Sequence, residues 1–204
     1  MKYFYLLMIS LLVLFAGCKN KAPKPEEIVL GEFEFLDSRD SQIYSWVKIG
    51  GQIWMEKNLN FATESGSWCY NNQEANCVKF GRLYSWNAAR TACPEGWHLS
   101  TDGEWASLDA ALGMYAGTKL KSGSGWQDNG GGSGSGGFNA LPGGDRNQYG
   151  TFTHIGSEAY FWTASQPDAT GAYGRFVTYN SYDIGRGIWD KQGGNSVRCV
   201  KNRE

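Results

Sequence analysis

The amino-terminal segment constrains the fold of this chain most, because it decides the compartment and so the state of the cysteines. Lys2 gives a short positive region, and residues 3–15 form an apolar run. The small pair Ala16-Gly17 and then Cys18 follow, an order typical of a secretory signal. The apolar run is shorter than the roughly 18 residues of a membrane-spanning helix. An exported chain can form disulfides, so we expect its other cysteines to shape the fold.

A cysteine directly after small residues resembles a bacterial lipobox. The resemblance implies cleavage before Cys18, diacylation of its thiol and acylation of the new amino terminus, and two or three acyl chains would anchor the protein stably. We therefore expect residues 1–17 to be a lipoprotein signal peptide, 18–30 to be the lipidated cysteine and an extended tether, and 31–204 to be the domain. The expected location is the bacterial envelope, in the outer membrane and at the cell surface, with the membrane as a partner through the lipid anchor.

Four cysteines remain in the domain: Cys69, Cys77, Cys93 and Cys199. An even number in an exported chain predicts two disulfides, for which three pairings are open. We favour Cys69 with Cys77, across a short polar loop, and Cys93 with Cys199, which would restrict the unfolded chain most. A zinc site built from all four is the alternative, disfavoured because the chain has no C-x-x-C pair.

The composition favours short strands and ordered loops around buried aromatic rings. The chain has 28 Gly, 9 Trp, 11 Tyr and 10 Phe, and only 19% of its residues are charged. So many aromatic residues argue against low-complexity disorder. Basic residues are scattered and the net charge is -1, so we expect no nucleic-acid partner and no polybasic membrane patch.

The first half of the domain contains signals for a hairpin and two helices. Two β-rich runs in residues 43–55 meet at Gly50-Gly51, which predicts a hairpin. Residues 81–92 are expected to form a helix. A second helix should begin after Thr101, whose capping box with Glu104 is a start signal, and should end at Gly113.

The second half contains a glycine-rich segment followed by short apolar runs. Residues 122–137, with GGGSGSGG at 130–137, predict a loop. Residues 159–165, 174–179 and 196–200 predict strands of an antiparallel sheet with long connections. The whole pattern predicts an α+β fold.

The chain resembles the Fibrobacter succinogenes major paralogous domain family, whose members are exported, often as lipoproteins, without an assigned biochemical role. The segments that carry the resemblance are DSRDSQIYSWVKIGGQIWMEKNLNF (37–61), CYNN (69–72), FGRLYSWNAARTACPEGWHLSTDGEWASL (80–108), KLKSGSGW (119–126), GFNALPGG (137–144), FWTAS (161–165) and SVRCV (196–200).

More distantly, CPEGWHLSTDGEW, FWTAS and the closing RCV resemble C-type lectin-like and formylglycine-generating-enzyme-like domains. This implies a C-type lectin-like fold: two helices, a looped and mostly antiparallel sheet, long ordered loops, and first and last strands brought together. Formylglycine-generating enzymes use a cysteine pair near the carboxyl end. This chain has only Cys199 there, so their oxidase chemistry is not expected.

Catalysis is not expected from the residues. The chain has two histidines, and neither an H-E-x-x-H motif nor a P-loop occurs. His98, just before a helix, is expected to be packed and hydrogen-bonded, and His154 to face solvent. We predict a non-catalytic domain.

Calcium is the one cofactor for which the residues offer candidate ligands. Gln166-Pro167-Asp168 resembles the QPD triplet of galactose-type C-type lectins, and Trp189-Asp190 lies where those lectins carry Trp-Asn-Asp. Here Lys191 replaces the third residue. Gln166, Asp168 and Asp190 supply fewer than the six to eight oxygens that calcium needs, unless Asn180, Asp183 or backbone carbonyls contribute.

Aromatic side chains in the late loops are the other candidates for ligand contact. Trp54, Trp97, Trp105 and Trp162 are expected in the core. The candidates, which lie in polar and loop-like contexts, are Trp126, Tyr173, Tyr182 and Trp189.

We therefore predict a cell-envelope lipoprotein whose domain binds or adheres to a glycan or protein ligand through loops 123–136 and 166–190. The alternatives are a structural subunit of a surface assembly and an enzyme of unrecognised type.

Overall fold

The structure is a computed structural model that describes residues 30–203. The expected lipidation site Cys18, the signal peptide and nearly all of the tether lie outside these residues. No helix within 30–203 has the length and apolar character needed to cross a membrane.

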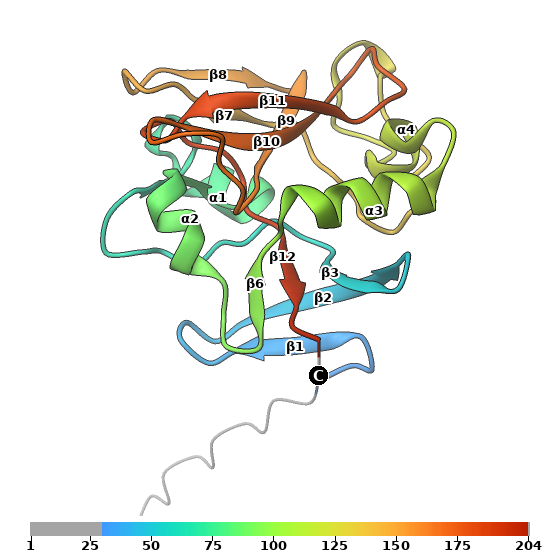
Figure 1. Ribbon diagram of the computed structural model, residues 1–204, viewed down its shortest axis with the longest axis horizontal. Coiled ribbons are helices and arrows are strands. Elements are labelled where there is room, and N and C mark those ends of the chain that lie inside the picture. Colours follow the sequence, from blue (N-terminus) through green and yellow to red (C-terminus); the bar gives the residue numbers. More distant parts are fainter. Residues whose placement is uncertain (1–29, 204) are drawn as a thin grey trace, which may run out of the picture.

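Two five-stranded sheets form the framework (Figure 1). In spatial order, the first contains β1 (Glu34–Asp37), β2 (Gln42–Ile49), β3 (Gln52–Met55), β12 (Cys199–Lys201) and β6 (Trp97–Leu99). The second contains β11 (Gly185–Asp190), β10 (Gly171–Thr178), β9 (Glu158–Trp162), β7 (Gly143–Arg146) and β8 (Phe152–Ile155). Every strand pair is antiparallel except β7 with β9.

Helices and a small ladder fill the space beside and between the sheets. The helices are α1 (Glu74–Phe80), α2 (Trp86–Ala92), α3 (Asp102–Leu112) and α4 (Ala116–Leu120), with 3-10 turns at Tyr70–Asn72 and Gln127–Asn129. The ladder pairs β4 (Ser67–Trp68) with β5 (Leu83–Tyr84). Figure 1 shows α3 between the sheets, and α3 contacts both β2 and β10. The predicted mixture of helices and a mostly antiparallel sheet is thus confirmed, with two more helices than expected.

The hairpin and the second helix formed where the sequence predicted them. Strands β2 and β3 pair on either side of Gly50-Gly51, both of which have positive φ angles, 57° and 82°, that suit glycine. At α3, the Thr101 side chain accepts a bond from the Glu104 amide, and the Glu104 carboxylate accepts one from the Thr101 amide. Gly113 ends the helix, so the capping box is confirmed.

The prediction of one helix over residues 81–92 was wrong in its first half. Gly81 has a φ of 75° and ends α1, and β5 then pairs with β4. Helix α2 begins only after Ser85, whose hydroxyl caps it by accepting from Ala88 N. Helix α1 begins inside the segment 70–76 that the sequence predicts to be a polar loop.

In the region 166–190, expected to act as a binding loop, the strand predicted at 174–179 is confirmed as part of β10, but β11 was not predicted. This segment contains β10, a turn and β11. Glycines made β11 hard to recognise from the sequence, because glycine is uncommon inside strands. They are needed here because aromatic rings lie against them: a Cβ at Gly185 would lie 2.2 Å from the Phe176 ring, and one at Gly187 would lie 2.6 Å from Trp189. The glycines leave room for rings that lie across the strands, a role that local composition does not reveal.

Residues 122–137 have little regular structure, as predicted, but they are held closely. Amides of Gly132, Ser133, Gly134 and Gly136 donate to carbonyls of residues 118–122. A Cβ at Gly132 would lie 2.0 Å from the Thr118 carbonyl oxygen. The glycines thus let this segment pack backbone against backbone beside α4.

The core consists of two adjoining aromatic clusters. Trp54 and Trp105 pack edge to face in one cluster, and Trp162 lies in the other, all fully buried. Trp97 is partly buried and stacks on Phe35. The four tryptophans predicted for the core therefore all pack there.

Candidate functional site

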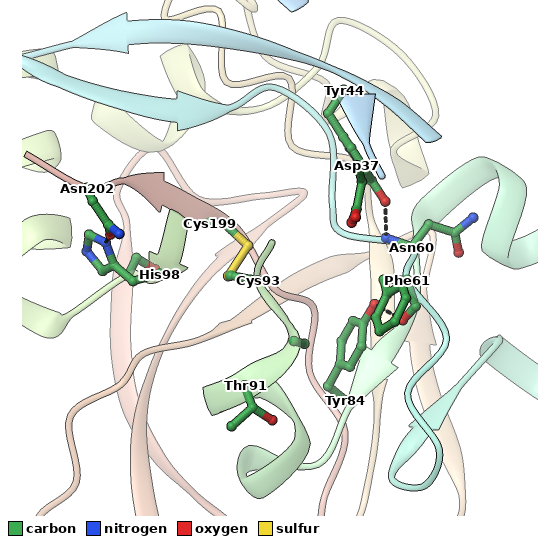
Figure 2. Close-up of a disulfide and its surroundings, with 12 residues drawn as sticks. Asp37, Tyr44, Asn60, Phe61, Tyr84, Thr91, Cys93, His98, Cys199 and Asn202 are labelled. Carbon is green, nitrogen blue, oxygen red and sulfur yellow. Dashed lines mark hydrogen bonds between the residues drawn. A yellow bond between two sulfur atoms is a disulfide. The ribbon is translucent and has the colours of Figure 1, made fainter. Parts of the chain in front are cut away.

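Both favoured disulfides are present. Cys69 bonds to Cys77, and Cys93 bonds to Cys199. Figure 2 shows the second bridge, which joins the end of α2 to β12. All four sulfur atoms are therefore consumed, which excludes the four-cysteine zinc site. In residues 30–203, the one cluster of metal-ligand side chains is Cys69, Glu74 and Cys77, and its two sulfurs are bonded to each other.

The two histidines are both engaged with carboxylates. His98 bonds to Glu104 through Nε2, at 2.9 Å, and to the Asn202 side-chain oxygen through Nδ1. The prediction that His98 is hydrogen-bonded is confirmed. His154 is 46% exposed at its side chain, as expected, and its Nδ1 lies 2.7 Å from an Asp145 oxygen.

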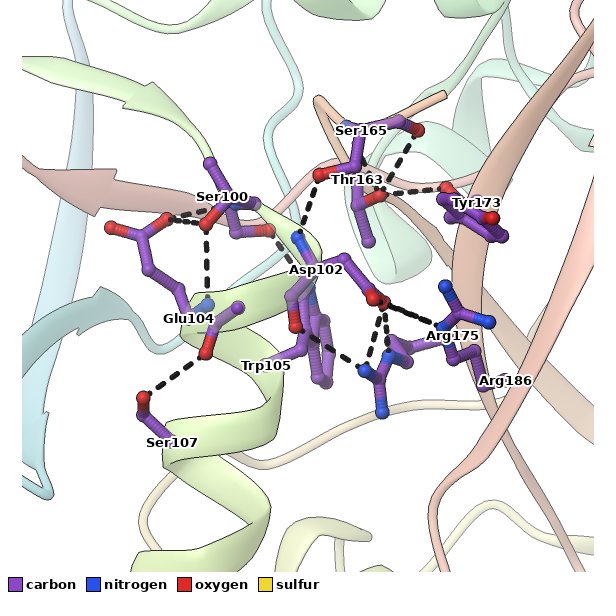
Figure 3. Close-up of polar contacts among 12 residues, drawn as sticks. Ser100, Asp102, Glu104, Trp105, Ser107, Thr163, Ser165, Tyr173, Arg175 and Arg186 are labelled. Atoms are coloured by element: carbon purple, nitrogen blue, oxygen red, sulfur yellow. Dashed lines mark hydrogen bonds and ion pairs between the residues drawn. The ribbon is translucent and has the colours of Figure 1, made fainter. Parts of the chain in front are cut away.

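The first turn of α3 carries a charged network that joins it to the second sheet (Figure 3). The Asp102 carboxylate accepts from Arg175 at 2.8 Å and from Arg186 at 3.0 Å. The Asp102 amide donates to the Ser165 hydroxyl. A carboxylate at a helix amino terminus also suits the helix dipole. These contacts hold the segment around Asp102 against the segment around Ser165 and against the second sheet, so the network has a structural role.

An ammonium lies among the oxygens that the sequence offered as candidate calcium ligands. Lys191 Nζ donates to Gln166 Oε1 at 2.5 Å and to the backbone carbonyls of Asp168 and Ala169 at 2.7 and 2.9 Å. The Asp168 carboxylate accepts from the backbone amides of the turn that follows it, which lowers its pKa. Asp190 accepts from the Gln192 amide. These candidate residues therefore form a turn that is filled by the Lys191 ammonium.

The other two residues considered as calcium ligands lie at the opposite end of the β10–β11 hairpin. Asn180 and Asp183 belong to the turn between β10 and β11, whereas Gln166 and Asp190 lie at the open end of that hairpin. The structure therefore does not bring the five residues together.

The four aromatic candidates do not form one surface. Trp126 is buried, with 7% exposed, and its indole donates to Ser122, so its prediction as a ligand contact was wrong. Tyr173 and Trp189 point to opposite faces of the β10–β11 hairpin, because Trp189 pairs with Ala172, the residue before Tyr173. Tyr182 is 66% exposed in the hairpin turn.

Tyr182 forms an exposed pair with a residue that sequence reasoning missed. Its ring lies 5.6 Å from the ring of Tyr115, edge to face, and Tyr115 is 56% exposed. Tyr115 has a φ of 61°, which is rare for a bulky side chain, and Met114 beside it is 74% exposed. We call Tyr115 and Tyr182 the tyrosine pair. The available signal was the pair of large side chains directly after Gly113.

A buried lysine holds the turn that carries Tyr182. Lys121 is 3% exposed, and its Nζ donates to the carbonyls of Thr178, Tyr179 and Ser181 at 2.9, 3.2 and 3.0 Å. Burial lowers the pKa of Lys121. All three N–H donors of the ammonium therefore have acceptors, and the turn is fixed before any ligand arrives.

Comparison with known proteins identifies the family. The family model of the Fibrobacter succinogenes major domain matches residues 47–201, which is most of the chain. The chain belongs to the Fibrobacter succinogenes major domain family. The match begins within β2 and ends with β12, so the family domain includes both disulfides and both sheets apart from β1 and the first five residues of β2. No curated protein and no solved structure matches the chain.

Proposed function

We propose that this member of the family is a lipid-anchored protein of the bacterial envelope whose domain binds a glycan without catalysis. The leader and Cys18 support the export and the anchor, and we place the protein in the outer membrane and at the cell surface as part of the proposal. Mass spectrometry of the native protein is expected to find a diacylglyceryl-modified amino terminus at Cys18. An intact Met1 or an unmodified thiol would overturn the anchor.

We further propose that the fold is C-type lectin-like. Two observations support this proposal. The last strand, β12, lies between β3 and β6 in the sheet that also holds the first strand. A disulfide with a sequence separation of 106 closes the chain from the end of α2 to β12. An experimental structure compared with C-type lectin-like domains would test the assignment.

The tyrosine pair is the observation that carries the binding proposal. Exposed aromatic rings offer large apolar faces with a polar hydroxyl, which suits stacking on sugar rings. Here Lys121 fixes the turn of Tyr182, and the amide of Thr118 in α4 donates to the Tyr182 carbonyl. A surface that is already ordered loses little conformational entropy on binding. The unusual backbone of Tyr115 is also the kind of local strain that gathers at functional positions.

A glycan array tests the proposal, with the full-length lipoprotein in detergent and with calcium or excess chelator. Wild-type protein is expected to bind in both conditions, because Lys191 fills the candidate calcium site. The variants Tyr115→Ala and Tyr182→Ala should lose binding. Tyr149→Ala is the matched control, since Tyr149 is 85% exposed in the turn between β7 and β8.

Each other outcome argues against the proposal. Binding that chelator abolishes would restore a calcium site. Binding that survives both tyrosine variants would place the glycan elsewhere. Absence of any glycan binding would favour a protein ligand or a structural assembly, which crosslinking in the envelope would detect.

A further inference from the structure

Arg198, a positively charged residue, is buried in the centre of the domain. It is 1% exposed, and its guanidinium lies 4.1 Å from the centre of the Phe138 ring. Its Nε donates to the Asn58 side-chain oxygen, and Nη1 donates to the carbonyls of Met55 and Phe138. Every acceptor is therefore a neutral oxygen.

No carboxylate contacts this guanidinium among residues 30–203. None of the ion pairs there includes Arg198. Its Nη2 makes one long contact, 3.5 Å to the Asn139 carbonyl. Desolvation lowers the pKa of Arg198 to about 9. Glu56 acts on this charge only through space, and one of its oxygens is taken by the Asn139 amide. A buried charge without an opposite charge in contact is costly.

A cavity of about 370 Å³ lies beside Arg198. Its wall includes Glu56 and Asn60, and its lining also includes two exposed lysines, Lys57 and Lys79. The Asn60 side-chain oxygen is buried and has no hydrogen-bond partner. The volume is within the range of small-molecule sites. Three cationic side chains and one carboxylate therefore line the cavity, and Asn60, which also lines it, has a buried oxygen without a partner.

We propose that this cavity binds a small polyhydroxylated anion, with the chemistry of an acidic sugar. The acid group would lie toward Arg198, Lys57 and Lys79, where it supplies the opposite charge that Arg198 lacks. Hydroxyl groups would donate to the Asn60 oxygen and to the carboxylate of Glu56. A neutral sugar would leave the cations uncompensated, and a simple inorganic anion would leave the acceptors unused.

This site is separate from the tyrosine pair. The cavity lies between the start of β2, the segment after β3, the end of α1 and its following Gly81, and its lining also includes Ser122, Asn139, Leu141 and Arg198. The tyrosine pair lies on the residue before α4 and on the turn between β10 and β11. The inference does not depend on the glycan proposed for that pair, and the variants Tyr115→Ala and Tyr182→Ala should leave it unchanged.

Isothermal titration calorimetry of the full-length lipoprotein in detergent tests the inference, with glucuronate, glucose and inorganic phosphate as probes. Glucuronate is expected to bind at least about tenfold more tightly than either other probe, because glucose lacks the charge that makes strong hydrogen bonds to the cations and phosphate lacks the hydroxyl array that reaches the acceptors. The double variant Lys57→Gln/Lys79→Gln should weaken glucuronate about tenfold. Both lysines are exposed, so this variant keeps the fold. Lys48→Gln, an exposed lysine outside the cavity, is the matched control.

A variant at the buried cation completes the test. Arg198→Lys should lose glucuronate binding, and circular dichroism will show whether it folds. If it does not fold, the double lysine variant decides. Equal affinity for glucose and glucuronate, tighter binding of phosphate, undetectable glucuronate binding, or full binding by the double variant would each overturn the inference.

Discussion

Removing the two disulfides one at a time should destabilise the domain by different amounts, because they close loops of different length. The sequence separation is 106 for Cys93–Cys199 and 8 for Cys69–Cys77. In the chain-entropy account, a cross-link lowers the entropy of the unfolded chain by an amount that grows with the logarithm of loop length. This gives about 4.7 kcal/mol for the long loop and about 2.5 kcal/mol for the short one.

The comparison uses Cys93→Ala/Cys199→Ala and Cys69→Ala/Cys77→Ala, with free energies of unfolding from denaturant titration. Each double variant removes at least one fully buried sulfur, since Cys199 is 0% and Cys77 is 1% exposed. The lost packing is therefore similar, and the difference reports loop length. We expect the long-loop variant to be less stable by about 2 kcal/mol. Equal losses, or a larger loss for Cys69–Cys77, would refute the reasoning.

Three further outcomes follow from the polar contacts and can be measured by the same unfolding titrations. Asp102→Asn should cost about 3 kcal/mol, because it leaves Arg175, whose side chain is 8% exposed, without its carboxylate, whereas Arg186→Gln should change little. Lys121→Met should cost about 2 kcal/mol and speed hydrogen exchange in the turn after β10, because three carbonyls lose their donor. Burial raises the pKa of Tyr44 from 10.0 to about 12, so the unfolded chain ionises first and stability should fall as pH rises from 10 toward 12. Unchanged stability in Asp102→Asn or in Lys121→Met, or phenolate absorbance showing Tyr44 ionised near pH 10, would contradict these assignments.

Local signals predicted those parts of the fold that local chemistry determines. The capping box at Thr101 fixes the start of α3, and Gly50-Gly51 fixes a hairpin, because each depends on neighbouring residues alone. The disulfide pairing was also accessible. One short loop was easy to close, and once Cys69 and Cys77 were paired only one partner remained for each of the other two.

The parts that depend on distant contacts were not accessible. Glycines in β11 read as loop residues until Phe176 and Trp189 are placed across them. The Lys191 side chain reads as a missing calcium ligand, although it supplies the positive charge itself. Trp126 lies in a polar, glycine-rich phrase, yet it is buried because that segment folds back along α4. For Lys191 and Trp126 the deciding partner is remote in the sequence or is a backbone atom. For the glycines of β11 it is a ring on the neighbouring strand or a ring two residues along the same strand.

The place of β12 within the first sheet determines how this domain can be combined with others. Strands β1 and β12 belong to the same sheet, and Figure 1 shows the carboxyl end beside β1, with α4 and the β10–β11 hairpin farther away. The chain thus enters and leaves at one side. A protein fused to the carboxyl end after β12 would therefore lie on the side of β1, away from the tyrosine pair.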